Sequence, residues 1–382
     1  MTDHAKRKTV QKTFGCALAE AKFRPSGFDY MRILLALSVI FFHSLPFCYG
    51  QDYVMRFWEG PARPVLKLIL PMFFILSGFL VGGSLDRSRT LVNFLGLRFI
   101  RIYPALIVEV VLSALLIGAA LTSLPLVDYF SAKDFWRYMF NVTGHISYLL
   151  PGVFADQPFP NIVNVQLWTV PYELKCYIAL AGIALLGVTK RKYLIFVIIV
   201  GMIFVDVLDR LDGKGFPMVI DMVRGRFLVM FFLCGVGLYL YRDKIPFSKP
   251  LFIVSVVLSV ITLSHMKYYG MYLSIVPATY MTVYLGLCNP KRNWLSACAD
   301  YSYGMFLYGA VIQQTIVDLF PTLREWYINI IISLPICFLI GWLSWHYVEK
   351  PMMTFRGKLK LLEENWIVLR ARLLKRLRLV RT

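Results

Sequence analysis

Charge is scarce in this chain, and acidic charge most of all. Only 16% of the 382 residues are charged, with 22 aspartates and glutamates against 41 lysines and arginines. Hydrophobic residues make up 58% of the chain and aromatic residues 15%. A soluble domain is excluded because it has no interior large enough for so much apolar surface. The composition predicts a polytopic membrane protein.

Signatures of several enzyme classes are also absent. The chain contains no Walker loop, no GxGxxG, no HExxH and no GxSxG, so neither nucleotide binding of those types nor zinc-protease or serine-hydrolase chemistry is indicated. None of the seven cysteines forms a CxxC pair, so the sequence predicts neither a disulfide framework nor a metal site. The sequence shows no internal repeat, which argues against the hypothesis that the protein is an inverted-repeat transporter.

The net charge of +19 raises the question of nucleic-acid binding. The basic residues, however, form short clusters between apolar runs, and no zinc-finger or RNA-binding signature accompanies them. This is the pattern of cytosolic loops in a membrane protein. We therefore expect a lipid bilayer and no nucleic acid among the partners.

Ten apolar segments are long enough to cross about 30 Å of hydrocarbon. They cover residues 31–48, 65–84, 104–124, 163–187, 193–208, 226–242, 250–266, 269–288, 303–320 and 326–348. If the chain starts inside, most lysines and arginines fall on the inner side, so both termini are expected in the cytosol. The predicted fold is all-α: a polytopic integral membrane helical bundle of about ten transmembrane helices, in the inner (cytoplasmic) membrane.

Three regions follow from this pattern. Residues 1–27 form a basic cytosolic N-terminal tail, 28–351 a transmembrane domain, and 352–382 a basic amphipathic cytosolic C-terminal tail. Leucines and arginines alternate in the C-terminal tail as in a helix that lies on an anionic inner leaflet, so no catalytic role is expected there. The longest outer loop, 125–162, suits gating or acceptor binding, and it contains a glycosylation sequon at Asn141.

The first apolar segment carries two ionisable residues. Arg32 and His43 are eleven residues apart, so they fall within about 20° of one helix face and ~16 Å apart along the axis. Ionisable groups within a span usually face a protein interior or a wet cavity, which makes both functional candidates. The alternatives are that Arg32 anchors the helix end and that His43 hydrogen-bonds a neighbouring helix.

Arg98 and Arg101 stand at the entrance to the third segment. Arginines three apart share a helix face and can clamp phosphates or carboxylates, although a positive-inside anchor would show the same spacing. Glu109, further along the segment, is a candidate internal partner for them. In the second segment, Ser77-Gly78 would let another helix or a ligand approach closely.

Glu173 lies about ten residues into the fourth segment, or ~15 Å deep, at a depth comparable to that of His43. If the two met, the carboxylate would orient the imidazole and raise its basicity. A structural bond from Glu173 to Lys175 or to an arginine is the alternative.

Six motifs in order resemble the membrane-bound acyltransferase 3 family over roughly residues 25–351. They are Asp29-x-x-Arg32-x10-His43, FFILSGF (73–79), Arg98-x-x-Arg101, QLWTVPYE (166–173), YSYGMFLY (301–308) and SWHYVEKP (344–351). Many relatives carry a histidine where this chain has Gly309, so no second histidine is expected there. Some relatives also carry a C-terminal extracytoplasmic SGNH domain; here a short basic tail follows the last segment, so the membrane domain is expected to acylate its acceptor unaided or to hand over to a separate protein.

The resemblance implies an integral-membrane O-acyltransferase. Such proteins move an acyl group, usually acetyl from acetyl-CoA, to hydroxyls of cell-envelope or secreted glycans or lipid-linked sugars. Acetyl-CoA would be a co-substrate, with no bound cofactor. We assign His43 and Glu173 to catalysis.

The remaining candidates, Arg32, Arg98, Arg101, Trp168 and Tyr172, are assigned to donor or substrate binding. The alternative function is a proton-coupled transporter or flippase in which His43 and Glu173 relay protons. The acceptor glycan and the oligomeric state are not encoded in any motif of the chain.

Overall fold

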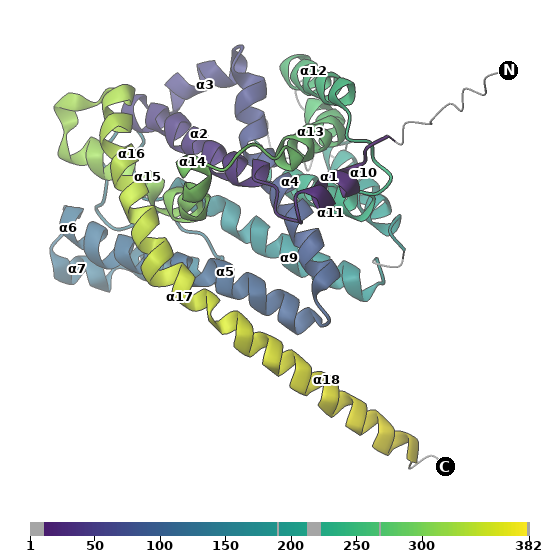
Figure 1. Cartoon of the computed structure of the whole chain (residues 1–382). Coiled ribbons are helices and arrows are strands. Elements are labelled where there is room, and N and C mark those ends of the chain that lie inside the picture. Colours follow the sequence, from purple (N-terminus) through teal and green to yellow (C-terminus); the bar gives the residue numbers. More distant parts are fainter. Residues whose placement is uncertain (1–10, 189–190, 212–222, 267–268, 380–382) are drawn as a thin grey trace.

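A computed structural model describes residues 11–188, 191–211, 223–266 and 269–379. Helices account for nearly all of the regular structure in these ranges, and no strand occurs in them. Figure 1 shows the helices gathered into one bundle, from which the C-terminal helix extends. The predicted all-α fold is confirmed.

Each of the ten predicted apolar segments contains a helix. These are α2 (Gly27–Tyr49), α4 (Arg63–Arg87), α5 (Leu91–Leu112), α9 (Val170–Leu185), α10 (Leu194–Leu211), α11 (Gly225–Leu240), α12 (Lys249–His265), α13 (Tyr269–Leu287), α15 (Ser302–Leu319) and α16 (Trp326–Leu343). Two are prolonged, α5 by the π-helical turn η1 (Ser113–Gly118) and α6 (Ala119–Leu121), and α16 by the π-helical turn η6 (Ser344–Glu349).

Four helical stretches in the described part of the chain have the length and hydropathy of a membrane span. They are Gly27–Tyr49, Arg63–Arg87, Leu91–Leu121 and Trp326–Leu369. Such stretches identify a multi-pass membrane protein. The count of about ten spans and the cytosolic position of the termini stay predictions.

Short helices connect the long ones. They are α1 (Phe14–Glu20), α3 (Gln51–Glu59), α7 (Leu126–Ser131), α8 (Lys133–Met139), η2 (Phe140–Thr143), η3 (Val165–Thr169), α14 (Trp294–Ala297), η4 (Cys298–Tyr301), η5 (Pro321–Leu323) and α17 (Lys350–Met353). Within the predicted N-terminal tail, α1 packs against the bundle: Phe14 is fully buried between the rings of Phe247 and Tyr280. The described end of this tail is therefore part of the bundle.

Helices α4 and α11 pack at very short range. A Cβ on Gly78 would lie 2.0 Å from the Phe232 carbonyl oxygen, and one on Gly235 would lie 2.4 Å from the Ile75 carbonyl oxygen. Only glycine permits backbones this close. The close approach predicted from Ser77-Gly78 is confirmed: the backbone of α11 packs directly against Gly78.

The predicted outer loop, 125–162, folds into α7, α8, η2 and an irregular return. Asn141 is fully buried there, donating to the Ser147 carbonyl oxygen at 2.9 Å and accepting from the Ser147 amide at 2.6 Å. Gln157, in the irregular segment after η2, binds this segment to α15 by donating to the Gln314 carbonyl oxygen and to Asp318. The asparagine of the sequon is thus a structural residue of the loop.

The C-terminal tail forms the helix α18 (Phe355–Leu379), as its sequence pattern predicts (Figure 1). Its position on a lipid surface stays a prediction. Near its start, α18 is fastened to the beginning of α5 through Glu363, whose carboxylate accepts hydrogen bonds from Thr90 and Asn93. The first turns of α18 therefore belong to the bundle.

Candidate functional site

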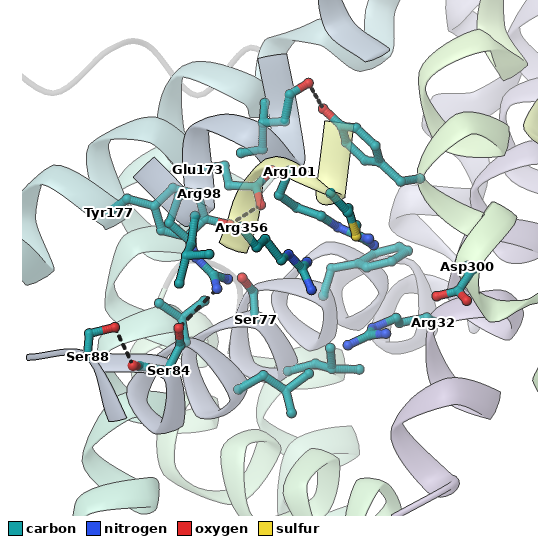
Figure 2. A pocket seen from close by; sticks show the side chains of 18 of the residues that line it. Arg32, Ser77, Ser84, Ser88, Arg98, Arg101, Glu173, Tyr177, Asp300 and Arg356 are labelled. Atoms are coloured by element: carbon teal, nitrogen blue, oxygen red, sulfur yellow. Dashed lines mark hydrogen bonds between the residues drawn. The ribbon is translucent and has the colours of Figure 1, made fainter. Parts of the chain in front are cut away.

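A cavity of about 940 Å³ opens among α2, α4, α5, α9, α15 and the start of α18 (Figure 2). Its charged lining consists of the basic residues Arg32, Arg87, Arg89, Arg98, Arg101, Arg356 and Lys360, and the acidic residues Glu173, Asp300, Glu363 and Glu364. Basic groups outnumber acidic ones, and in a cleft with low-dielectric walls such an excess concentrates anions. The cavity suits a ligand with several negative charges.

One wall of the cavity is apolar. It is formed mainly by α4, with Phe306 of α15 beside it, and comprises Leu70, Phe73, Phe74, Leu76, Leu80, Val81 and Phe306. The rings of Phe73 and Phe306 meet edge to face at 5.9 Å. A pocket with an apolar wall and a few charged groups binds and orients a ligand that has both an apolar part and a charged part.

Arg98 and Arg101 both line the cavity, as their shared helix face predicts. Arg98 donates through Nη2 to the Ser84 hydroxyl at 3.0 Å, and its guanidinium carbon lies 5.9 Å from the centre of the Tyr177 ring. Arg101 lies at the same distance over Trp345. Among the described residues neither forms an ion pair within 4.0 Å, so their charge is free to attract an anion.

Glu109 does not serve as the internal partner expected for these arginines. Its Oε1 instead accepts from the Ser113 hydroxyl at 2.8 Å and from Asn164 Nδ2 at 2.7 Å. Asn164 also donates to the Leu307 carbonyl oxygen at 2.7 Å. The expectation is corrected: Glu109 joins α5 to the segment before α9 and, through Asn164, to α15.

Arg32 reaches the same cavity from α2. Its nearest carboxylate is Asp29, at 3.7 Å, and Asp29 is also 3.2 Å from Arg292. Asp29 therefore lies between two guanidiniums, and Figure 2 shows a second carboxylate, that of Asp300, beside Arg32. The structure thus brings Arg32, Arg98 and Arg101 together at one cavity, from two helices.

Glu173 also lines this cavity, and its carboxylate accepts a hydrogen bond from the Tyr177 hydroxyl one helical turn later. Figure 2 shows both beside Arg98, with Ser77 facing them from α4. The structural alternative with Lys175 is not formed, since Lys175 is exposed with its ammonium 4.9 Å from the Tyr172 ring centre. Nor does Glu173 form an ion pair within 4.0 Å with Arg98 or Arg101, although Figure 2 shows Arg98 beside it.

His43 lies away from these charged groups and is not among the residues that line the cavity. Its Nδ1 is 2.8 Å from the Val39 carbonyl oxygen, and its ring stacks 5.8 Å from that of Phe47. A carbonyl can only accept, so this bond places the proton on Nδ1 and leaves Nε2 with its lone pair. No hydrogen bond joins His43 to Glu173.

The helix segment that carries His43 is held by buried amides. Gln313 of α15 donates both to the Ile40 carbonyl oxygen, at 2.9 Å, and to Asn329 of α16, at 3.0 Å. Asn329 returns a bond to the Gln313 carbonyl oxygen at 3.0 Å. These buried hydrogen bonds fix the relative positions of α2, α15 and α16, and they leave only Gln313 Oε1 of the two side-chain amides without a partner.

Trp168 and Tyr172 pack on each other near the start of α9, with ring centres 5.9 Å apart. Neither lines the cavity, although Thr169 and Val170 between them do. The assignment of Trp168 and Tyr172 to substrate binding stays a prediction.

Other residues of the cavity were not identified from the sequence. Tyr177 follows Glu173 by four residues, so the i,i+4 spacing of a helix was an available signal. Ser84 and Trp345 hold the two arginines, and Arg356 enters from the C-terminal helix. Trp345 belongs to the SWHYVEKP motif, which assigned it no role, and no local pattern identifies Ser84 or Arg356, because their positions depend on how distant helices pack.

The fold is that of a multi-pass membrane protein with a cavity rich in basic groups. The chain belongs to the acyltransferase 3 family, whose model, described as an acyltransferase domain, matches residues 26–346. This confirms the resemblance read from the six motifs.

Two relatives cover most of the chain. It is 27% identical to the O-acetyl transferase of Shigella phage Sf6, over 86% of this chain and 96% of the relative. It is 25% identical to nodulation protein 10 of Rhizobium leguminosarum bv. viciae, over 87% and 95%. No solved structure matches the chain.

Proposed function

We propose that this protein transfers an acyl group, acetyl above all, from acyl-CoA to a hydroxyl of a cell-envelope or secreted glycan. The observation that carries the proposal is the convergence of Arg32, Arg98 and Arg101 on one cavity that also has an apolar wall. Coenzyme A combines several phosphate charges with a long, weakly polar pantetheine arm. The arginines would then match the phosphates of the donor, and the apolar wall would match its pantetheine arm.

The donor's phosphates would bind at Arg98 and Arg101. Guanidiniums donate paired hydrogen bonds to phosphate oxygens, and these bonds are stronger than neutral ones. The pantetheine arm would extend along α4 and lead the thioester towards His43, ~16 Å from Arg32 along α2. In the proposed topology the arginines face the cytosol, where acyl-CoA is made, and the protein resides in the inner membrane.

His43 would act through Nε2. The acceptor hydroxyl loses its proton to Nε2 as its oxygen attacks the thioester carbonyl; the C–S bond then breaks and the CoA thiolate leaves. An acyl-imidazole intermediate on Nε2 is the alternative route, and both suit an imidazole whose other nitrogen holds the proton. Glu173 would take part in catalysis from its position in the cavity, beside Tyr177 and the arginines, and not through a hydrogen bond to His43.

The name of the phage relative, an O-acetyl transferase, supports acetyl as the group and an oxygen as the acceptor atom. The family of the chain favours an enzyme over the transporter alternative. The glycan or lipid-linked sugar acceptor follows from the resemblance given above.

The proposal is tested with purified full-length protein in detergent. CoA should raise its thermal midpoint, and acetyl-CoA should be hydrolysed slowly in the absence of acceptor, because a bound thioester is open to attack by water. A transporter would respond to neither. Absence of both effects would overturn the proposed function.

A further inference from the structure

The first turns of α18 present one charged face to the cavity. Arg356, Lys360, Glu363 and Glu364 all line it, at spacings of four, three and one residue. Residues four and seven or eight apart share a face of an α-helix. Lys358, between them, points elsewhere: its ammonium lies 4.8 Å from the Phe355 ring centre and it does not line the cavity.

Arg356 points into the middle of the basic cluster. Figure 2 shows its guanidinium among Arg98, Arg101 and Arg32 and across from Ser77. Arg98 and Arg101 are close enough to repel it, and Asp300 is close enough to attract it. In the described structure Arg356 has no hydrogen bond or ion pair. A cluster of like charges such as this is relieved by an anion.

Glu363 fixes α18 in this position. Its Oε1 accepts from the Thr90 amide at 2.6 Å and the Thr90 hydroxyl at 2.8 Å, and its Oε2 accepts from Asn93 Nδ2 at 2.9 Å. Thr90 is the N-cap of α5, where backbone N–H groups lack helical partners and a negative charge is favourable. The same helix presents Arg98 and Arg101, so their register with Arg356 is set by direct contact.

We propose that α18 completes the donor site, with Arg356, aided by Lys360, binding phosphate of the acyl-CoA. This rests on the proposed function and extends it to a part of the chain beyond residue 346, where the match to the family model ends. A C-terminal tail that resembles a membrane-surface helix would then be a wall of the substrate cavity. The ligand chemistry is a phosphate ester carried on an organic arm.

The binding test compares Arg356→Ala with Lys358→Ala in the purified full-length protein. Both remove one positive charge from the same helix, two residues apart, but only Arg356 faces the cavity. CoA should bind about ten-fold more weakly to Arg356→Ala, the scale of one charge-assisted hydrogen bond, and normally to Lys358→Ala. Pantetheine, which lacks the phosphates, should bind all three proteins alike.

Three outcomes separate the inference from the proposed function. Wild-type protein that does not bind CoA would overturn both. If Arg98→Ala weakens CoA binding while Arg356→Ala does not, only the role of α18 fails. A loss of pantetheine affinity in Arg356→Ala equal to its loss of CoA affinity would also refute phosphate contact, since the effect would then be a general disturbance of the cavity.

The anchoring role of Glu363 is tested by Glu363→Gln against Glu364→Gln. Both remove one negative charge from the cavity wall, but only Glu363 bonds α5. Amide exchange at Thr90 should rise in Glu363→Gln alone, together with a several-fold loss of CoA affinity. Unchanged exchange and affinity in Glu363→Gln would show that α18 is not positioned through this contact.

Discussion

The guanidinium carbon of Arg101 lies 5.9 Å from the centre of the Trp345 ring. Trp345 belongs to the π-helical turn η6 (Ser344–Glu349), and single π-turns in helices often occur at functional sites. An aromatic face steadies a cation without neutralising it, as a carboxylate would. Arg101 is thereby positioned in the cavity with its full charge available to a ligand.

The first prediction concerns donor affinity. Arg98→Ala and Arg101→Ala should each weaken CoA binding by about ten- to a hundred-fold, because a hydrogen bond to a charged group contributes about 1.5–3 kcal/mol. Lysine should restore the affinity only in part, since it lacks the paired donors. Isothermal titration with CoA measures the effect.

Arg137→Ala is the control for that titration. Arg137 is exposed on α8 and pairs with Asp134 at 3.1 Å, and it does not line the cavity. Its replacement should leave CoA affinity unchanged. Wild-type affinity in both folded cavity variants would restore the view that Arg98 and Arg101 only anchor a helix end.

The second prediction concerns His43. His43→Gln should abolish acyl transfer and leave CoA binding intact, because glutamine keeps a hydrogen-bonding group of similar reach but no titratable nitrogen. Loss of a general base lowers the rate by about 10²–10⁴-fold; loss of an obligatory acyl carrier should lower it further. The measurement is transfer of labelled acetyl from acetyl-CoA to the glycan.

His346→Gln provides a matched comparison. His346 also bonds the carbonyl four residues earlier, that of Trp342 at 2.9 Å, and likewise does not line the cavity. A histidine with only this structural role should tolerate glutamine. The catalytic assignment of His43 fails if the His43→Gln enzyme transfers acetyl at a rate similar to that of His346→Gln.

The third prediction concerns topology and uses a native thiol. The hydrogen bond with the Thr13 hydroxyl lowers the pKa of Cys16, which is exposed. A lower pKa increases the thiolate fraction at neutral pH, and the thiolate is the reactive form. A membrane-impermeant maleimide should therefore label Cys16 readily in inverted vesicles and not in intact cells, if the N-terminus is cytosolic.

The other six cysteines are buried or half-buried, so Cys16→Ser should remove most of the labelling. Labelling of the wild-type chain in intact cells would place the N-terminus outside. The proposed cytosolic access to the cavity would then be wrong as well.

The fourth prediction concerns the contact between α4 and α11. Gly78→Ala should destabilise the protein by about 1–3 kcal/mol, the range for overpacking, because the added Cβ would lie 2.0 Å from the Phe232 carbonyl oxygen. Gly182→Ala in α9 is the control, since no atom lies within 4 Å of a Cβ there. It should be neutral or stabilising, by up to about 1 kcal/mol. Equal thermal midpoints in the two variants would contradict the close packing.

Local patterns predicted much of this structure. Hydropathy located the helices, and the spacing of Arg98 and Arg101 correctly predicted a shared face, because both signals are contained within one segment. Which helices lie side by side is set by packing between distant segments. The sequence therefore could not decide whether Glu173 meets His43, and in the structure Glu173 lies with Tyr177 at the cavity instead.

The same limit applies to both ends of the chain. The basic, amphipathic character of α18 correctly predicts a helix, but contact with Thr90 depends on a single carboxylate, Glu363. In the N-terminal tail, one aromatic residue, Phe14, docks α1 between two distant rings. Contacts made by one residue leave no periodic pattern, and composition alone described these ends as tails.

The burial of Asn141 has a consequence for producing the protein in eukaryotic cells. An oligosaccharide on this asparagine would replace one hydrogen of Nδ2, the atom that donates to Ser147, with a bulky sugar, so a glycosylated chain could not close the loop around the buried side chain. Yeast or insect hosts, which modify such sequons during translocation, would yield a damaged fraction. Exposed Thr143 contributes only a hydrogen bond to the Phe140 carbonyl oxygen. Thr143→Ala would therefore remove the sequon while keeping the asparagine, and give a uniform preparation.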